Sequence, residues 1–162
     1  MSITRISIIS AALVLGAATA FADPKPKNAK ITDSQTVANF YAGTSRIWTG
    51  CKGGVYFGGG FEATAYCNKQ GPAVAVGKWS VKKGVICSNL TWFWKEGSGV
   101  GSKPGDRPNC IAHVTDAEGN IWRRWNDDTD WWRLQPIKDD TKAKKGNAFK
   151  GKISRMRRKL NV

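Results

Sequence analysis

Short runs of β-branched and aromatic residues fill the middle of the chain, and glycine, asparagine or aspartate interrupts them every eight to twelve residues. Runs of this length between turn-forming residues are typical of strands. We therefore expect eight strands, at residues 46–50, 54–57, 61–67, 74–81, 85–94, 110–115, 120–125 and 131–134. The pattern predicts a mainly β protein, a small antiparallel barrel or a curved sheet. The glycine-rich residues 97–108 are expected to form a long flexible loop.

Two segments before the first strand have a different pattern. Residues 23–31 are polar and contain two prolines, which predicts a disordered leader. Asp33 and its neighbours then offer an N-cap for a short helix over residues 35–42, whose apolar side chains gather on one side, and Gly43 is placed to end it. We expect the β domain, including this helix, to occupy residues 32–137.

The last segment, residues 138–162, is a basic tail with a helical pattern. Phe149, Ile153, Met156 and Leu160 recur at spacings of four, three and four residues, and basic residues lie between them. Gly151 lowers the stability of such a helix by about 1 kcal/mol relative to alanine. The segment is therefore expected to become ordered on a surface or a partner, as a separate element from the β domain.

The charge of the chain is concentrated in this tail. Residues 138–162 hold ten Lys and Arg but only two Asp, and the whole chain carries a net charge of +14. Such a concentration attracts polyanions. The basic residues expected to bind them are Arg155, Arg157, Arg158 and Lys159. The alternative is that the charge only keeps the protein soluble.

The first 22 residues read as a cleavable signal peptide. A short basic start is followed by an uncharged apolar run over residues 6–20 and by the small residues Ala20 and Ala22. The apolar run is shorter than the roughly 20 residues that span a bilayer, so a retained anchor is the weaker interpretation. We expect a periplasmic or secreted protein with no transmembrane segment after cleavage. Nucleic acid is then not an expected partner, whereas an anionic envelope glycan, lipid headgroups or an acidic protein are.

Four cysteines in an exported protein predict two disulfides. Along the predicted strands, the expected pairs are Cys51 with Cys67 and Cys87 with Cys110. The alternative, a four-thiolate zinc site, lacks the short C-x-x-C pairs that such sites use, so no metal is expected.

Catalytic motifs are not found in the sequence. The single histidine, His113, lies in a predicted strand, where packing or hydrogen bonding is favoured over general-base catalysis. There is no G-x-S-x-G elbow, no H-E-x-x-H pair and no phosphate-binding glycine loop. We expect a protein that is not an enzyme and needs no cofactor.

Tryptophan is the residue type that points most strongly to binding, because the chain contains eight. Strand alternation places Trp92 and Trp94 on one face, and Trp122 and Arg124 together on a face of another strand. Trp beside Arg suits planar or anionic ligands. The alternative is that these rings fill the core. The sequence thus favours a non-enzymatic binding module, and its rival is a lipocalin-like carrier that encloses a small apolar ligand.

The order of several segments resembles a known family. FYAGTSRIW is followed by GGVYFGGGFEATAYC and then by VGKWSVKKGVIC, with a further cysteine before a strand. This order is similar to that of the exported alphaproteobacterial family called domain of unknown function 995, over about residues 37–134. These motifs are structural, so the resemblance implies an exported β protein and no particular reaction. The basic tail lies outside it.

Overall fold

The structure is a computed structural model that describes residues 24–162. The predicted signal peptide therefore lies outside the described residues. Within residues 24–162, no helix is long and apolar enough to cross a membrane. The elements in chain order are β1 (Lys30–Ile31), α1 (Ser34–Tyr41), β2 (Thr44–Trp48), the 3-10 helix η1 (Thr49–Cys51), β3 (Gly53–Phe57), β4 (Glu62–Asn68), β5 (Pro72–Lys82), β6 (Val85–Glu96), β7 (Gly99–Pro104), β8 (Asn109–Thr115), β9 (Ile121–Trp125), β10 (Trp132–Arg133), β11 (Ala143–Lys145) and α2 (Lys150–Leu160).

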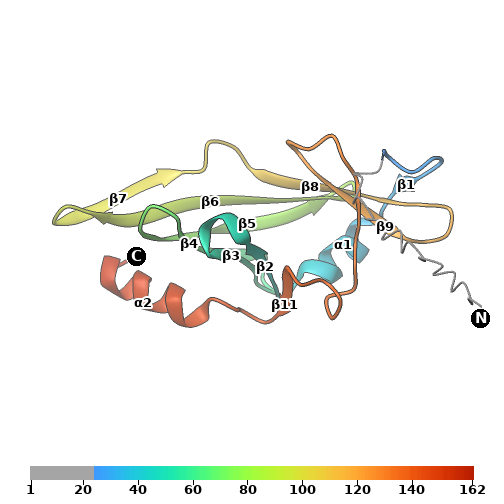
Figure 1. The fold of residues 1–162 in the computed structure, drawn as a ribbon. Helices are drawn as coiled ribbons and strands as arrows, with labels where there is room; N and C mark the ends of the chain where they lie inside the picture. The colour runs from blue at the N-terminus through green and yellow to red at the C-terminus, as the bar shows by residue number, and fades with distance from the viewer. Residues whose placement is uncertain (1–23) are drawn as a thin grey trace, which may run out of the picture.

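One antiparallel sheet contains all the strands. Its main path runs β10-β9-β8-β6-β5-β4-β3-β2-β11, with β1 paired to β8 and β7 paired to β6. The sheet curls into a half-barrel, so the predicted mainly β, curved antiparallel fold is confirmed (Figure 1). All eight predicted strands are present, and α1 covers most of the segment for which a helix was predicted.

The centre of the sheet is the long hairpin of β5 and β6, which pair from Ala73 opposite Trp94 to Lys82 opposite Val85. The turn at its end needs left-handed backbone, and Lys83 and Gly84 have φ of 49° and 70°. Two consecutive residues with positive φ match the twist of antiparallel strands. Gly84 has a further reason to be glycine, because a Cβ there would lie 2.7 Å from the carbonyl oxygen of Thr32.

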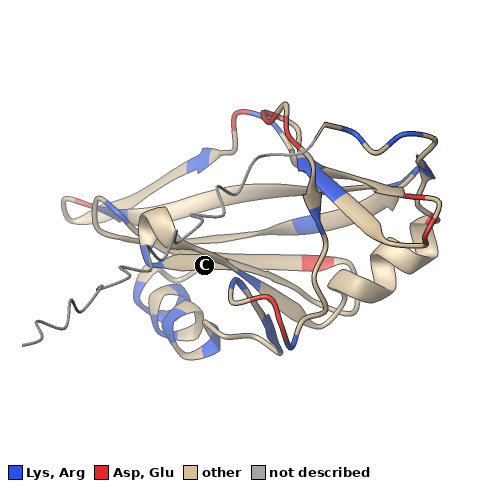
Figure 2. Cartoon of the chain, turned by 45° about the vertical axis from the view of Figure 1, so that its right-hand side comes forward, with Lys and Arg blue, Asp and Glu red and all other residues tan. Residues whose placement is uncertain are grey.

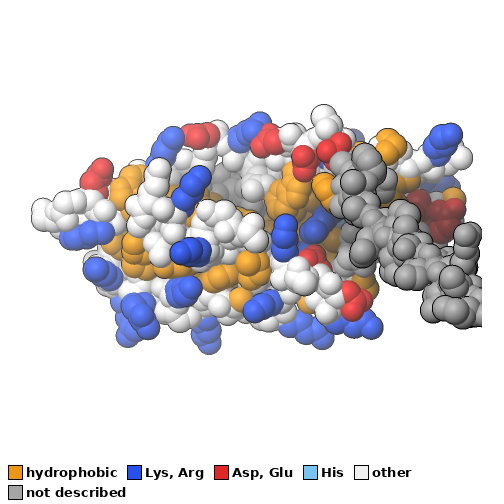
Figure 3. Space-filling model, in the orientation of Figure 1, with side chains coloured by type: hydrophobic (Ala, Val, Ile, Leu, Met, Phe, Trp, Pro, Cys, Tyr) orange, Lys and Arg blue, Asp and Glu red, His pale blue; other side chains and the backbone are white. Residues whose placement is uncertain are grey.

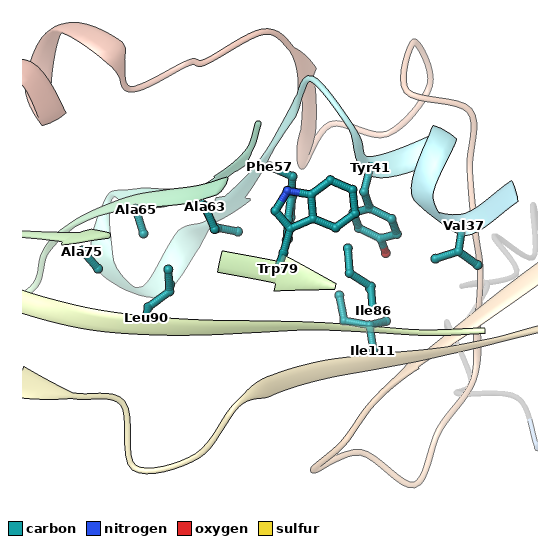
Figure 4. Packing of buried hydrophobic residues seen from close by; sticks show 11 residues of the cluster. Val37, Tyr41, Phe57, Ala63, Ala65, Ala75, Trp79, Ile86, Leu90 and Ile111 are labelled. Carbon is teal, nitrogen blue, oxygen red and sulfur yellow. The ribbon is translucent and has the colours of Figure 1, made fainter. Parts of the chain in front are cut away.

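The concave face of the half-barrel holds the main core. Inward side chains of β3 to β6 and β8 pack together, and α1 adds Val37 and Tyr41 from one end (Figure 4). Trp79 is 3 % exposed, packs edge-on against Phe57 and donates a hydrogen bond from Nε1 to the carbonyl oxygen of Gly58. Burial of such large side chains contributes roughly 1.5–3 kcal/mol each. This core fixes the curvature of the sheet and the position of α1.

The convex face carries α2. Ile153, Met156 and Leu160 of the helix and its N-cap residue Phe149 pack against Tyr66 of β4 and the buried Val74 of β5. The apolar positions predicted from spacing therefore do form one face of a helix, and that face is buried against the protein's own sheet. In Figure 1 this helix lies below the sheet, apart from α1.

Three expectations from the sequence need correction. The predicted leader ends in a strand, because Lys30 and Ile31 pair with Thr115 and Val114 of β8. The predicted flexible loop contains β7, which pairs with the second half of β6. The basic tail is part of the fold, because β11 pairs with β2 and α2 completes the convex core.

Candidate functional site

The two ends of the sheet approach each other along one side of the half-barrel, and a buried ion cluster joins them. Arg46 of β2 donates a hydrogen bond from Nη1 to Oδ2 of Asp140 at 2.7 Å, and Nη2 of Arg123 on β9 lies 3.5 Å from the same oxygen. The side chains of Arg46 and Asp140 are only 3 % and 8 % exposed. We call the gap between β2 and β9 the seam. Asp140 precedes β11, so the tail supplies the carboxylate that joins its two sides.

Aromatic rings of α1 hold the Arg46 guanidinium in place. Its central carbon lies 4.8 Å from the ring centroids of both Phe40 and Tyr41. The hydroxyl of Tyr41 is 3.0 Å from Nε2 of His113, whose Nδ1 is 3.1 Å from the carbonyl oxygen of Gly84. Because that carbonyl can only accept, we assign the proton of neutral His113 to Nδ1, and Nε2 accepts from Tyr41.

Burial sets the protonation of this network. It lowers the pKa of His113 to about 4, and the nearby cations Arg123 and Arg46 act in the same direction. Burial likewise raises the pKa of Tyr41, although the two arginines oppose this. At neutral pH both groups are therefore uncharged, and His113 serves as a hydrogen-bonding group in the core. The negative charge that faces Arg46 and Arg123 comes from Asp140.

The ion cluster is short of hydrogen-bond acceptors. Nε and Nη2 of Arg46 and Nε of Arg123 are buried and find no partner among residues 24–162. Two guanidiniums share one carboxylate, which leaves one positive charge without a counterion at the seam. A buried unpaired donor costs about 1–3 kcal/mol, and more when it is charged.

A cleft of about 790 Å³ opens along the seam, and we call it the seam cleft. Arg46 and Arg123 line it together with three tryptophans, Trp48, Trp125 and Trp132. Its further charged lining residues are Arg133, Lys142 and Asp128. The cleft thus combines flat apolar surfaces with an excess of cations.

A second cleft, of about 720 Å³, contains Trp92 and Trp94, and we call it the Trp92–Trp94 cleft. The predicted placement of these two residues on one face is confirmed. Lysines 69, 95 and 103 lie around them. The ring of Trp92 also contacts that of Trp48, with centroids 6.1 Å apart, so the two clefts are adjacent on the concave side.

Trp122 and Arg124 do share a face of β9, as predicted, but local contacts engage both and neither lines the two clefts. Trp122 donates from Nε1 to Oδ2 of Asp116 at 2.7 Å, within the turn that precedes β9. The guanidinium of Arg124 lies 5.4 Å from the ring centroid of Trp131. The opposite face of β9, with Arg123, is the one that meets the seam.

The predicted basic residues Arg155, Arg157, Arg158 and Lys159 are all exposed on α2. The burial of Ile153, Met156 and Leu160 turns them outward. Figure 2 shows Lys and Arg along the ribbon of α2, and Figure 3 shows Lys and Arg side chains along the lower edge of the molecule.

Two of the four cysteines form a disulfide, and the other two are free. Cys87 of β6 and Cys110 of β8 lie opposite each other and are bonded, as predicted. The predicted bond between Cys51 and Cys67 is absent, and both are free thiols. Burial and the neighbouring Cys67 thiol raise the pKa of Cys51 to about 11. Among residues 24–162, no three His, Cys, Asp or Glu side chains come together as a metal site.

Sequence reasoning missed Arg46, Arg123 and Asp140. A weak signal for Arg46 was present, because this charged residue begins the predicted strand of residues 46–50, between a serine and an apolar residue. The pairing of Arg46 with Asp140 had no such signal, because the two residues are 94 positions apart.

The fold is an antiparallel half-barrel whose two open clefts are lined by tryptophans and cations. Residues 8–150 match the family described as "Protein of unknown function (DUF995)", and the chain belongs to that family. The match extends beyond the resemblance seen in the motifs and includes β11. Comparisons with curated proteins and with solved structures gave no match.

Proposed function

We propose that this protein is an exported, non-enzymatic binding module that holds an anionic polymer or surface of the bacterial envelope on the outer face of α2. The observation that carries the proposal is the division of α2 into two faces. Its apolar side chains are buried against the sheet, so its exposed face consists mainly of Lys and Arg.

The cationic surface is larger than the helix alone. No acidic residue occurs after Asp140, and β11, which precedes α2 in the chain, adds Lys144 and Lys145. We call this surface the α2 basic face, and its exposed cations are Lys144, Lys145, Lys150, Lys152, Arg155, Arg157, Arg158 and Lys159. Like charges held this close together on a folded scaffold create a local positive potential that favours polyanions.

Electrostatic attraction, without insertion, is the mode of binding that this geometry supports. An amphipathic helix that enters a lipid surface needs a free apolar face. The apolar face of α2 is not free, because Ile153, Met156 and Leu160 are at most 7 % exposed. Attachment should therefore weaken steeply as salt is added.

The rival function, a carrier that encloses an apolar ligand, has less support. The sheet is open along the seam, and the small pocket at the centre of the concave face measures about 10 Å³. That volume is roughly what one water molecule needs. The open clefts beside it are lined by cations as well as by tryptophans.

The test removes four positive charges from α2 and compares the binding of this variant with that of a variant that loses four positive charges elsewhere. The variant replaces Arg155, Arg157, Arg158 and Lys159 with glutamine. The matched control replaces four exposed lysines remote from α2 in the sequence, Lys25, Lys27, Lys82 and Lys83, so both variants have the same net charge. Binding is measured by co-sedimentation with phosphatidylglycerol vesicles and with insoluble polyuronate, across a salt series.

We expect affinity to fall about fivefold for each charge removed from α2, and far less for the control. Loss on vesicles alone identifies a lipid surface, and loss on polyuronate alone identifies a glycan. Equal retention of both variants and the unaltered protein would show that the α2 basic face is not a binding surface.

A further inference from the structure

We propose that the seam cleft is a separate site for a small organic anion, in which a carboxylate carried on a ring binds the arginines at the seam and the ring lies against the tryptophans. This site differs from the α2 basic face in position and in ligand. Its central charged groups are buried side chains held in fixed positions, whereas the α2 basic face consists of exposed side chains.

The first argument is the charge that the seam leaves unbalanced. Arg46 and Arg123 meet one carboxylate, that of Asp140, and three of their buried N–H groups have no acceptor among residues 24–162. Charges are rarely buried without partners, because the desolvation cost is several kcal/mol per ion. A second carboxylate at the seam would supply the missing negative charge, and it can reach Arg123, whose side chain is 16 % exposed.

The second argument is the excess of cations around the opening. Arg133 and Lys142 are exposed and line the cleft beside the two buried arginines. Asp128 is the acidic residue among the cleft-lining residues, and with Asp140 it leaves two more positive than negative charges. Arginine is the side chain best suited to a carboxylate, because its planar guanidinium can donate two parallel hydrogen bonds.

The third argument is the shape of the cleft. Trp48 and Trp125 are half-buried, and Trp132 is 41 % exposed, which is unusual for so large an apolar ring. Flat aromatic walls beside fixed cations suit a ligand with a ring face and a charged edge. A volume of about 790 Å³ has room for one or two such rings. An acidic sugar and an aromatic acid share this chemistry.

The experiment titrates the full-length mature protein with glucuronate, benzoate and glucose, followed by calorimetry and by tryptophan fluorescence. We expect at least one of the two acids to bind, and neutral glucose not to bind. Binding of glucuronate identifies an acidic sugar, whereas binding of benzoate alone identifies an aromatic acid.

Two variants test the position of the site. Replacing both Arg133 and Lys142 with glutamine changes exposed residues, so folding should survive, and affinity for the acid should fall about tenfold. The control replaces Arg155 and Arg157 on α2 with glutamine and should leave this affinity unchanged. The control also separates the two proposals, because it weakens attachment to polyanions and not binding in the cleft.

A third variant, Asp140→Asn, tests the charge argument by thermal unfolding. The variant lacks the counterion of Arg46, so the bound acid should raise its melting temperature more than that of the unaltered protein. The proposal is overturned if neither acid binds, if glucose binds as well as the acids, or if the Arg133 and Lys142 variant binds unchanged.

Discussion

Arg46 of β2 and Arg123 of β9 share the carboxylate of Asp140, although their strands lie near opposite ends of the path through the sheet. A barrel closes such a gap with backbone hydrogen bonds between its first and last strands. Here the edge strands β10 and β11 have only two and three residues, and a buried ion cluster joins the two sides instead. Short edges of this kind also offer little backbone for unwanted pairing between molecules.

Replacing Asp140 with asparagine should therefore strongly destabilise the fold. The change leaves Arg46 buried without a counterion, and loss of one partner of a buried pair costs about 3–5 kcal/mol. The neighbouring Asp139 is exposed, so Asp139→Asn should change the free energy of unfolding by less than about 0.5 kcal/mol. Urea denaturation followed by tryptophan fluorescence measures both. Similar values for the two variants would contradict a closing role for Asp140.

The strands could be predicted from the sequence because their residues carry the signal locally. Runs such as those of β5 and β6 are rich in β-branched and aromatic residues and end at turn-forming ones. β7 was missed because GVGSKP has no such pattern, and its strand forms through pairing with β6. β1 and β11 are too short for periodicity to detect. In each of these cases a partner distant in sequence determines the local structure.

The site could be predicted only in part, for a related reason. Alternation correctly placed Trp92 with Trp94 and Trp122 with Arg124, but it does not say which face of a strand points inward. For β9 the register of its pairing with β8 determines the inward face, because Arg123 lies opposite the buried His113 and Trp125 lies opposite the buried Ile111. The sequence also indicated the amphipathic pattern of α2 without showing that the sheet itself covers its apolar face.

The stability of the protein should depend on pH through His113. The folded state holds this residue neutral, with a pKa of about 4 against an ordinary value of 6.5. The resulting stabilisation is complete above about pH 6.5 and is lost as the pH falls toward 4, by up to about 3 kcal/mol. The variant His113→Asn keeps an amide donor near the position of Nδ1 but does not titrate. The difference in unfolding free energy between the two proteins should therefore shrink from pH 7 to pH 4.5, and a constant difference would contradict this role.

The bond between Cys87 and Cys110 should stabilise the fold by constraining the unfolded chain. The cysteines are 23 positions apart, and a loop of that length corresponds to about 3 kcal/mol in the chain-entropy description. The double alanine variant should lose about this much in urea denaturation without reductant. Replacing Cys51 and Cys67 with alanine is the matched control, and it should cost less because those thiols are free. Equal losses would show that the second pair is bonded in solution as well.

The tail should be required for folding, contrary to the expectation that residues 138–162 form a separate element. Deleting them removes β11, the carboxylate of Asp140 and the helix that covers Tyr66 and Val74. The truncated chain should lose cooperative unfolding and the fluorescence of buried tryptophan.

Single substitutions on α2 separate this packing role from its charge. Ile153→Ser and Met156→Ser should each lower the free energy of unfolding by about 2–5 kcal/mol, as do other buried apolar truncations. Arg155→Ala, on the exposed face between them, should change it by less than about 0.5 kcal/mol. At salt and temperature where all three variants are folded, only Arg155→Ala should weaken attachment to anionic vesicles or polyuronate. If Ile153→Ser instead leaves stability unchanged and abolishes attachment, the apolar face of α2 contacts the partner and does not pack on the sheet.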